Sequence, residues 1–124
     1  MLIQELKDQI KITSVNYNDP WVRRGIQSLN RSIFTDELID TKKDHLAQWW
    51  ILWVNGEVAG YASLTPQGNN GGYLSRAGIL PQFRGRGLQQ RLIDVRIQAA
   101  ERQGWKWLVT DTEKNNMASQ RSLQ

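Results

Sequence analysis

Cysteine is absent from this 124-residue chain, and histidine occurs only once, as His45. Without cysteine there are no disulfides, thiolate metal ligands or cysteine nucleophiles, and one histidine cannot form a multi-histidine metal site. We therefore expect no metal. No apolar run approaches the length of a membrane span, and the N-terminus lacks the basic-then-apolar layout of a signal peptide. Together these absences favour a soluble, cytoplasmic protein with no membrane partner.

The length and the charge of the chain set further bounds. A chain of this length can bury one core but not two, so we interpret residues 1–124 as a single domain. Lysine and arginine number 16 and aspartate and glutamate 12, which gives a net charge of +4. This mild excess suits an anionic cofactor. Nucleic acid is the less convincing partner, because the basic residues form no continuous stripe.

The first third of the chain predicts helices after a short segment whose pattern leaves two structures open. Residues 1–10 fit an amphipathic helix, whereas residues 10–15 alternate as a strand. Asp19 followed by Pro20 predicts a helix start, because a capping carboxylate precedes a proline at the first helical position, and the apolar spacing continues to Phe34. Residues 35–37 begin a second helix, with His45 near its end as a surface or capping residue.

The middle of the chain predicts an antiparallel arrangement. Strands are predicted at residues 48–54, 57–64 and 73–80. The first is apolar on both faces, which fits a doubly buried strand, and we interpret its tryptophans as core residues: Trp49, Trp50 and Trp53. Asn55 and Gly56 indicate a hairpin, because both turn positions need positive φ. The polar, glycine-rich segment 65–72 is predicted to be a mobile loop.

Two glycines separate the strand at 73–80 from the next helix. Gly85 and Gly87 let the backbone pass close to a ligand, because neither has a Cβ. The helix that begins at Leu88 leaves its first N–H groups without internal partners, and its dipole adds positive potential. Arg84 and Arg86 bring further positive charge, so this stretch is a candidate phosphate cradle. By itself a glycine pair is equally compatible with a structural turn.

The predicted helix from Leu88 ends at Gly104, and charged residues mark the face away from the core. That face carries Arg91, Arg96, Glu101 and Arg102. Residues 105–109 then alternate as a strand, and the strand–helix–strand order favours a parallel pair. A polar stretch follows, and residues 117–123 predict a last helix.

This order of elements resembles the GNAT superfamily of acetyl-CoA-dependent N-acetyltransferases. Its most specific part is ILPQFRGRGL at residues 79–88, followed about thirty residues later by a helix led by NMAS at residues 116–119. The resemblance implies an α/β (α+β) fold with a mixed, mostly antiparallel sheet flanked by helices. It also implies acetyl-CoA as co-substrate and direct attack on the thioester by a primary amine of a small-molecule or peptide acceptor.

The resemblance also implies how this chain would hold the cofactor. Ile79 and Leu80 would offer backbone groups to the pantetheine arm, and Asn116 and Ser119 would face its thiol end. Main-chain N–H groups would wrap the pyrophosphate, contributed by Arg84, Gly85, Arg86, Gly87, Leu88 and Gln89.

The chain departs from the family pattern in three places. Gln89 occupies the last small-residue position of the cradle, and Leu123 stands where many members have a tyrosine as general acid. The sequence also ends before the closing strand pair of the family, so the strand at 105–110 is expected to have an exposed edge. Lost C-terminal sequence is the favoured explanation, and a homodimer that completes the sheet is the next.

No residue stands out as a general base. The candidates for catalysis are Tyr73, Ser75, Asp111 and Glu113, and no pattern singles one out. A second hypothesis is therefore a non-catalytic GNAT-like module that binds acyl-CoA or a protein partner. A third is a small basic nucleic-acid binder, which the regular strand and helix patterns around the RGRG segment oppose.

Overall fold

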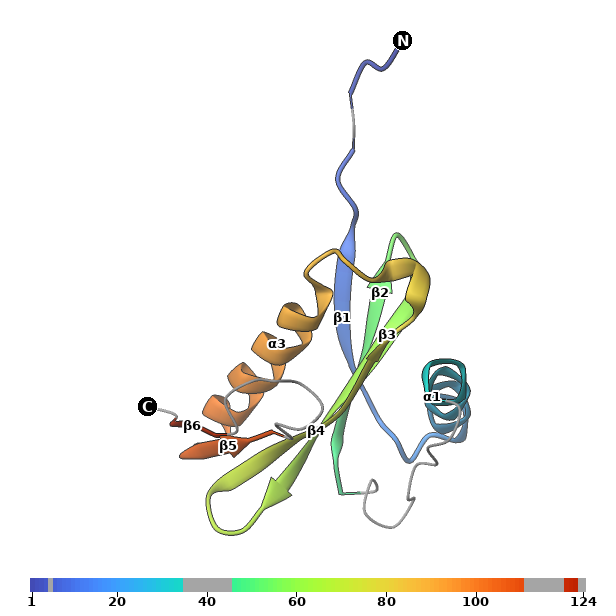
Figure 1. Cartoon of the computed structure of the whole chain (residues 1–124). Helices are drawn as coiled ribbons and strands as arrows, with labels where there is room; N and C mark the ends of the chain where they lie inside the picture. Colours follow the sequence, from blue (N-terminus) through green and yellow to red (C-terminus); the bar gives the residue numbers. More distant parts are fainter. Residues whose placement is uncertain (5, 35–45, 111–119, 123–124) are drawn as a thin grey trace.

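In the part of the chain that the structure describes, six strands form one sheet in the order of the chain, and two α-helices pack against it (Figure 1). The computed structural model describes residues 1–4, 6–34, 46–110 and 120–122. The strands are β1 (Ile10–Val15), β2 (Gln48–Val54), β3 (Glu57–Gln67), β4 (Gly71–Ile79), β5 (Trp107–Val109) and β6 (Gln120–Ser122). The helices are α1 (Pro20–Ile33), the short 3₁₀ helix η1 (Pro81–Phe83) and α3 (Leu88–Arg102).

Neighbouring strands are antiparallel except β4 and β5, which run parallel. A parallel pair needs a crossover connection, and α3 provides it. The mixed, mostly antiparallel sheet confirms the predicted fold class, and the β4–β5 pair confirms the predicted parallel unit. No helix in the described ranges is long and apolar enough to cross a membrane.

Helix α1 begins and ends as its sequence predicts. The Asp19 carboxylate accepts a hydrogen bond from the Trp21 N–H at 3.0 Å, and Pro20 occupies the first helical position. The helix ends at Ile33, where the Phe34 N–H donates to the Asn30 carbonyl. The predicted second helix over residues 35–45, with His45, lies outside the described residues.

Helices α1 and α3 cover opposite faces of the sheet (Figure 1), and each face has its own core. Ile26 of α1 packs with Trp49 and Tyr61, whereas Trp50 packs with Ile93 of α3. Successive side chains of a strand point to opposite faces, so β2 is buried on both, as predicted. Trp49 and Trp50 are core residues, exposed by 0% and 6%. They are therefore closed to stacking with nucleic-acid bases.

The N-terminal ambiguity is resolved in favour of the strand. Residues 10–15 form β1, which pairs with β2, while residues 1–4 and 6–9 form neither helix nor strand. Met1, Leu2, Ile3 and Leu6 are exposed. Because these apolar side chains pack against no other part of the described chain, a helix in this segment would gain no stability from burying one face.

The predicted mobile loop at residues 65–72 is wrong. Strand β3 continues to Gln67 and β4 begins at Gly71, so the turn is confined to three residues. Gly68 and Asn70 take φ values of +59° and +59° there, in the left-handed region that glycine and asparagine tolerate best. The remaining glycines of the segment are therefore part of a strand.

Packing explains why Gly71 and Gly72 are glycines. A Cβ on Gly71 would lie 1.9 Å from the Trp107 ring, and a Cβ on Gly72 would lie 2.2 Å from the Trp105 ring. The two indole rings occupy the space that side chains would need where β5 joins β4. Because this contact is remote in sequence, the local pattern of polar and glycine residues could not reveal it.

The C-terminal prediction is wrong in two respects. Residues 120–122 form β6 rather than part of a helix, and β6 pairs antiparallel with β5. The edge of β5 that was expected to be exposed is therefore occupied. The physical reason is that an unpaired strand edge presents a row of N–H and C=O groups, which a following segment can satisfy.

Candidate active site

The RGRG loop, residues 84–87, connects η1 to α3. Gly85 and Gly87 have φ values of +79° and +73°, and Gly87 is the N-cap residue of α3. A Cβ on either glycine would meet no atom within 4 Å. Glycine is needed here for its backbone conformation, and the space beside it is open to a ligand.

The first turn of α3 has no internal partner for its N–H groups. No side chain of the described residues caps the helix, and its first turn contains no acidic residue. The helix start therefore presents free donors and the positive end of the dipole to whatever lies beside the RGRG loop. This arrangement favours a phosphate or pyrophosphate group.

The two arginines of the loop are held by the chain itself. The Arg84 Nε donates to the Ile79 carbonyl at 3.0 Å. Arg86 forms an ion pair with Asp8 at 3.0 Å and donates to the Gln82 carbonyl at 3.3 Å. Asp8 was not predicted as part of the site, because only the fold brings residues 8 and 86 together.

Beyond the loop, β4 has an open edge. The pairing with β5 covers only residues 71–73 of β4, so among the described residues no strand lies beside residues 74–79 on that side. The Leu80 N–H donates to the Ala59 carbonyl of β3. Because successive residues of a strand turn their backbone groups to opposite edges, the Ile79 N–H faces the open edge.

Ile79 and Leu80 thus differ in what they can offer. The Ile79 carbonyl is used by Arg84, but its N–H faces the open edge. The Leu80 N–H is used by Ala59, and its carbonyl accepts from the Phe83 N–H at 2.9 Å. The backbone of Leu80 is therefore already satisfied within the chain, and Ile79 is the residue with a donor to spare.

A β-bulge interrupts β4 within the open edge, close to the point where β5 joins. The register with β3 shifts between Ala62 and Leu64. The Arg76 N–H donates to the Ser63 hydroxyl at 2.9 Å, and the Ser75 hydroxyl bonds to those of Ser63 and Thr65 at 2.7 and 2.8 Å. Ser75 therefore belongs to a hydroxyl network that fixes the bulge, and its recorded partners include no base that could activate it.

Arg96 holds the same bulge from the α3 side. Its Nη1 donates to the Ser63 carbonyl at 3.1 Å and to the Arg76 carbonyl at 3.5 Å. Burial lowers the pKa of Arg96 to about 10, and the group remains charged at neutral pH. The prediction that Arg96 lies on the solvent face of the helix is wrong, because its side chain is 3% exposed.

The other predicted catalytic and cofactor-binding residues are placed only in part. Tyr73 pairs with Thr65 and with Val109, at the last point where β4 and β5 are joined. Asp111, Glu113, Asn116 and Ser119 lie outside the described residues. Of the catalytic candidates, Tyr73 is therefore the one that lies where β4 and β5 separate and the open edge of β4 begins.

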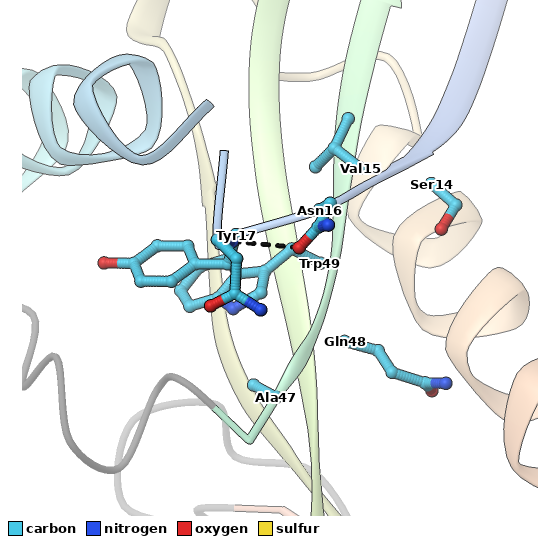
Figure 2. A pocket seen from close by; sticks show the side chains of 8 residues that line it. Ser14, Val15, Asn16, Tyr17, Ala47, Gln48 and Trp49 are labelled. Atoms are coloured by element: carbon cyan, nitrogen blue, oxygen red, sulfur yellow. Dashed lines mark hydrogen bonds between the residues drawn. The ribbon is translucent and has the colours of Figure 1, made fainter. Parts of the chain in front are cut away.

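A recess of about 420 Å³ lies elsewhere, at the end of β1 and the beginning of β2 (Figure 2). In it the Tyr17 ring stacks on Trp49, with 4.7 Å between ring centroids. Gln48 also lines the recess and is bonded to Gln103. Because β3 lies between β2 and β4, which are about 10 Å apart, this recess is separate from the open edge of β4.

The acetyltransferase (GNAT) family model matches residues 7–124. The chain belongs to this family. Solved GNAT-like structures share the fold at low sequence identity. The IAA acetyltransferase of Bacillus cereus has a TM-score of 0.68 and 14% identity, over 82% of this chain and 65% of that one.

Two further solved structures contain acetyl-CoA or CoA. A GNAT family acetyltransferase from Elizabethkingia anophelis, with acetyl-CoA bound, has a TM-score of 0.66 and 18% identity, over 84% of this chain and 65% of that one. A Bacillus subtilis acetyltransferase in complex with CoA has a TM-score of 0.68 and 13% identity, over 82% and 64%.

The GNAT chain described here spans less than two thirds of the length of each of these three structures. A search of the curated proteins found no match. The solved structures show the shared fold, and the family match shows membership of the GNAT family.

Proposed function

We propose that this GNAT domain is an acetyl-CoA-dependent N-acetyltransferase that acts on a primary amine of a small molecule or peptide. One observation carries the proposal: the uncapped start of α3 and the open edge of β4 meet at Ile79 and the RGRG loop. A ligand made of a diphosphate and a long amide-bearing arm fits these two features. The diphosphate needs hydrogen-bond donors, which the start of α3 offers, and the arm needs a free strand edge, which β4 offers.

The residues present fit coenzyme A. The N–H groups of residues 84–89 would hold the pyrophosphate, and the Ile79 N–H would pair with an amide of the pantetheine arm. The backbone of Leu80 is satisfied internally, so its predicted contact with the cofactor is reduced to its side chain. Asn116 and Ser119 remain proposed neighbours of the thiol end. When bound, acetyl-CoA supplies the activated acetyl group.

The reaction proposed is direct attack of the amine on the thioester. The chain contributes by fixing the geometry of the reacting groups and by excluding alternative orientations along β4. Tyr73 is the candidate for proton transfer, because it is the last residue of β4 that pairs with β5, at the point where the open edge begins. A positioned acid or base of this kind contributes about 10²- to 10⁴-fold.

The alternative is a GNAT-like module that binds acyl-CoA without transfer. One observation favours it: among the described residues, the Ser75 hydroxyl bonds to the hydroxyls of Ser63 and Thr65, and neither partner is an acid or a base. A homodimer that completes the sheet is a further proposal. β6 already occupies the outer edge of β5, so a partner would add to β6 instead.

Release of coenzyme A thiol from acetyl-CoA in the presence of a panel of primary amines tests the proposal. The variant Gly87→Leu places a side chain in the open space of the RGRG loop, and we expect it to abolish transfer. Gly104→Leu is the matched control, because Gly104 has a φ of +78°, no atom within 4 Å of an added Cβ and a position at the other end of α3. We expect Gly104→Leu to lose similar stability and to keep its activity.

Amine-dependent thiol release that disappears in Gly87→Leu alone supports the transferase. Acetyl-CoA binding without transfer to any amine of the panel supports the binding module. Equal loss of activity in the two glycine variants would contradict the assignment of the RGRG loop, because it would trace the loss to backbone strain.

A further inference from the structure

Arg96 is the one charged side chain that is buried in the part of the chain that the structure describes. Its Nε donates to the Leu92 carbonyl at 3.0 Å, and its Nη1 donates to the carbonyls of Ser63 and Arg76. These carbonyls satisfy hydrogen bonds but bring no negative charge. A buried cation is costly unless something compensates it, so the structure maintains a fixed positive charge at the bulge of β4.

No carboxylate of the surrounding described elements neutralises this charge. The titratable groups of the packed elements are Glu57 and Tyr61 of β3, Tyr73 and Arg76 of β4, and Arg91, Asp94, Glu101 and Arg102 of α3. Strand β5 has none. Asp94 and Glu101 are exposed, and Asp94 accepts a hydrogen bond from Gln90 at 2.9 Å. Glu57 is exposed at the first residue of β3, beside the hairpin turn.

The charge lies where the reacting end of the ligand is expected. The pantetheine arm would run from the RGRG loop along the open edge, so its sulfur end would approach the bulge. Arg76, whose carbonyl Arg96 contacts, lies three residues from Tyr73, the last residue of β4 joined to β5. Helix α3 starts at the loop, and Arg96 lies about 12 Å further along its axis, level with the bulge of β4.

We propose that Arg96 supplies the positive charge that favours coenzyme A thiolate as the leaving group; this inference rests on the proposed function. In the transfer step the amine nitrogen bonds to the acetyl carbon, and the carbon–sulfur bond breaks. The electron pair stays on sulfur, and the amine loses its proton to solvent, with Tyr73 as the candidate that relays it. The resemblance puts Leu123 where many members have a tyrosine as general acid, and a fixed charge would serve the departing sulfur in its place.

The inference predicts a pH-dependent preference for the free thiol over the acetylated form. A thiol titrates at a pH of about 8.5 in water. At about 8 Å and an effective dielectric constant of about 20, a unit charge favours a nearby anion by roughly 30-fold. The affinity for coenzyme A, divided by that for acetyl-CoA, should therefore rise about 20-fold between about pH 6.5 and about pH 9. Acetyl-CoA is the reference because its sulfur carries no ionisable proton.

Calorimetric titration of the purified chain with coenzyme A and with acetyl-CoA at the two pH values is the test. We expect the rise in the wild type, its loss in Arg96→Met, and its retention in Arg96→Lys, which keeps the charge. Arg91→Met is the matched control, because Arg91 is an exposed residue of the same helix. Arg76→Met tests the second cation of the bulge and should also retain the rise.

If the ratio of the two affinities of the wild type does not change between the two pH values, that result alone would overturn the inference. The same rise in Arg96→Met as in the wild type, or its loss in Arg91→Met or Arg76→Met, would also overturn it. If Arg96→Met does not fold, Arg96→Lys and Arg76→Met still test whether the rise in the affinity ratio comes from the charge at residue 96. Failure of the wild type to bind either ligand would instead contradict the proposed function, and this inference with it.

Discussion

Replacement of Gly71 by alanine is expected to destabilise the protein, although glycine-to-alanine changes in regular structure usually do the opposite. The added Cβ would lie 1.9 Å from the Trp107 ring, whereas carbon atoms in contact are about 3.5 Å apart or more. The ring would have to move by roughly 1.5 Å or rotate into solvent. Overpacking of this kind costs about 1–3 kcal/mol.

Gly25→Ala is the matched control for this prediction. Gly25 is an exposed residue of α1, and a Cβ there would meet no atom within 4 Å. Alanine should stabilise the helix by about 0.5–1 kcal/mol, because glycine loses more backbone entropy on folding. The two substitutions are chemically identical and are expected to have opposite signs.

Thermal unfolding followed by tryptophan fluorescence measures both changes. For a domain of this size, about 1 kcal/mol corresponds to about 4 °C in Tm, so Gly71→Ala should melt about 4–12 °C lower and Gly25→Ala about 2–4 °C higher. The emission of Gly71→Ala should also shift to the red as Trp107 becomes exposed. A Gly71→Ala protein as stable as the wild type would refute the packing account of this glycine.

Three further predictions concern the candidate site. Asp8→Asn should change stability by less than about 1 kcal/mol, because the pair with Arg86 is exposed, and should tighten acetyl-CoA binding several-fold at low salt; equal affinities in titration calorimetry would contradict this. Tyr73→Phe should lower kcat by about 10²-fold with acetyl-CoA affinity unchanged; an unchanged steady-state rate would remove Tyr73 from the mechanism. Because burial lowers the folded-state pKa of Arg96 to about 10, the unfolded chain binds more protons above that pH. The stability of the wild type relative to Arg96→Met should therefore rise by about 1 kcal/mol between about pH 9 and about pH 11 in paired denaturant titrations, and a constant difference would contradict the burial of the charge.

The parts of the fold that the sequence predicts are those fixed by neighbouring residues. The Asp19 cap, the Asn55–Gly56 turn and the Gly87 helix start each depend on the conformation of a few adjacent residues. Asn55 and Gly56 indeed take φ values of +52° and +83°. The apolar residues on both faces of β2 likewise predict that the strand is buried on both sides, because a strand has only two faces.

The parts that the sequence does not predict depend on contacts between distant segments. The glycines at 71 and 72 are typical of a loop until Trp105 and Trp107 are known to cover them. Arg96 has the spacing of a solvent-facing residue, and its burial depends on the bulge that frees the Ser63 carbonyl to accept its guanidinium. Asp8 joins the site only because β1 leads the N-terminal segment past the hairpin turn to Arg86.

The central claim is that acetyl-CoA binds at the RGRG loop and along the open edge of β4. Calorimetric titration of the wild type with acetyl-CoA, beside a Gly85→Leu/Gly87→Leu variant and the Gly104→Leu control, tests it most directly. The account predicts one site per chain, with binding lost in the double variant and kept in the control. Absence of binding by the folded wild type, or unchanged binding by the double variant, would contradict the account.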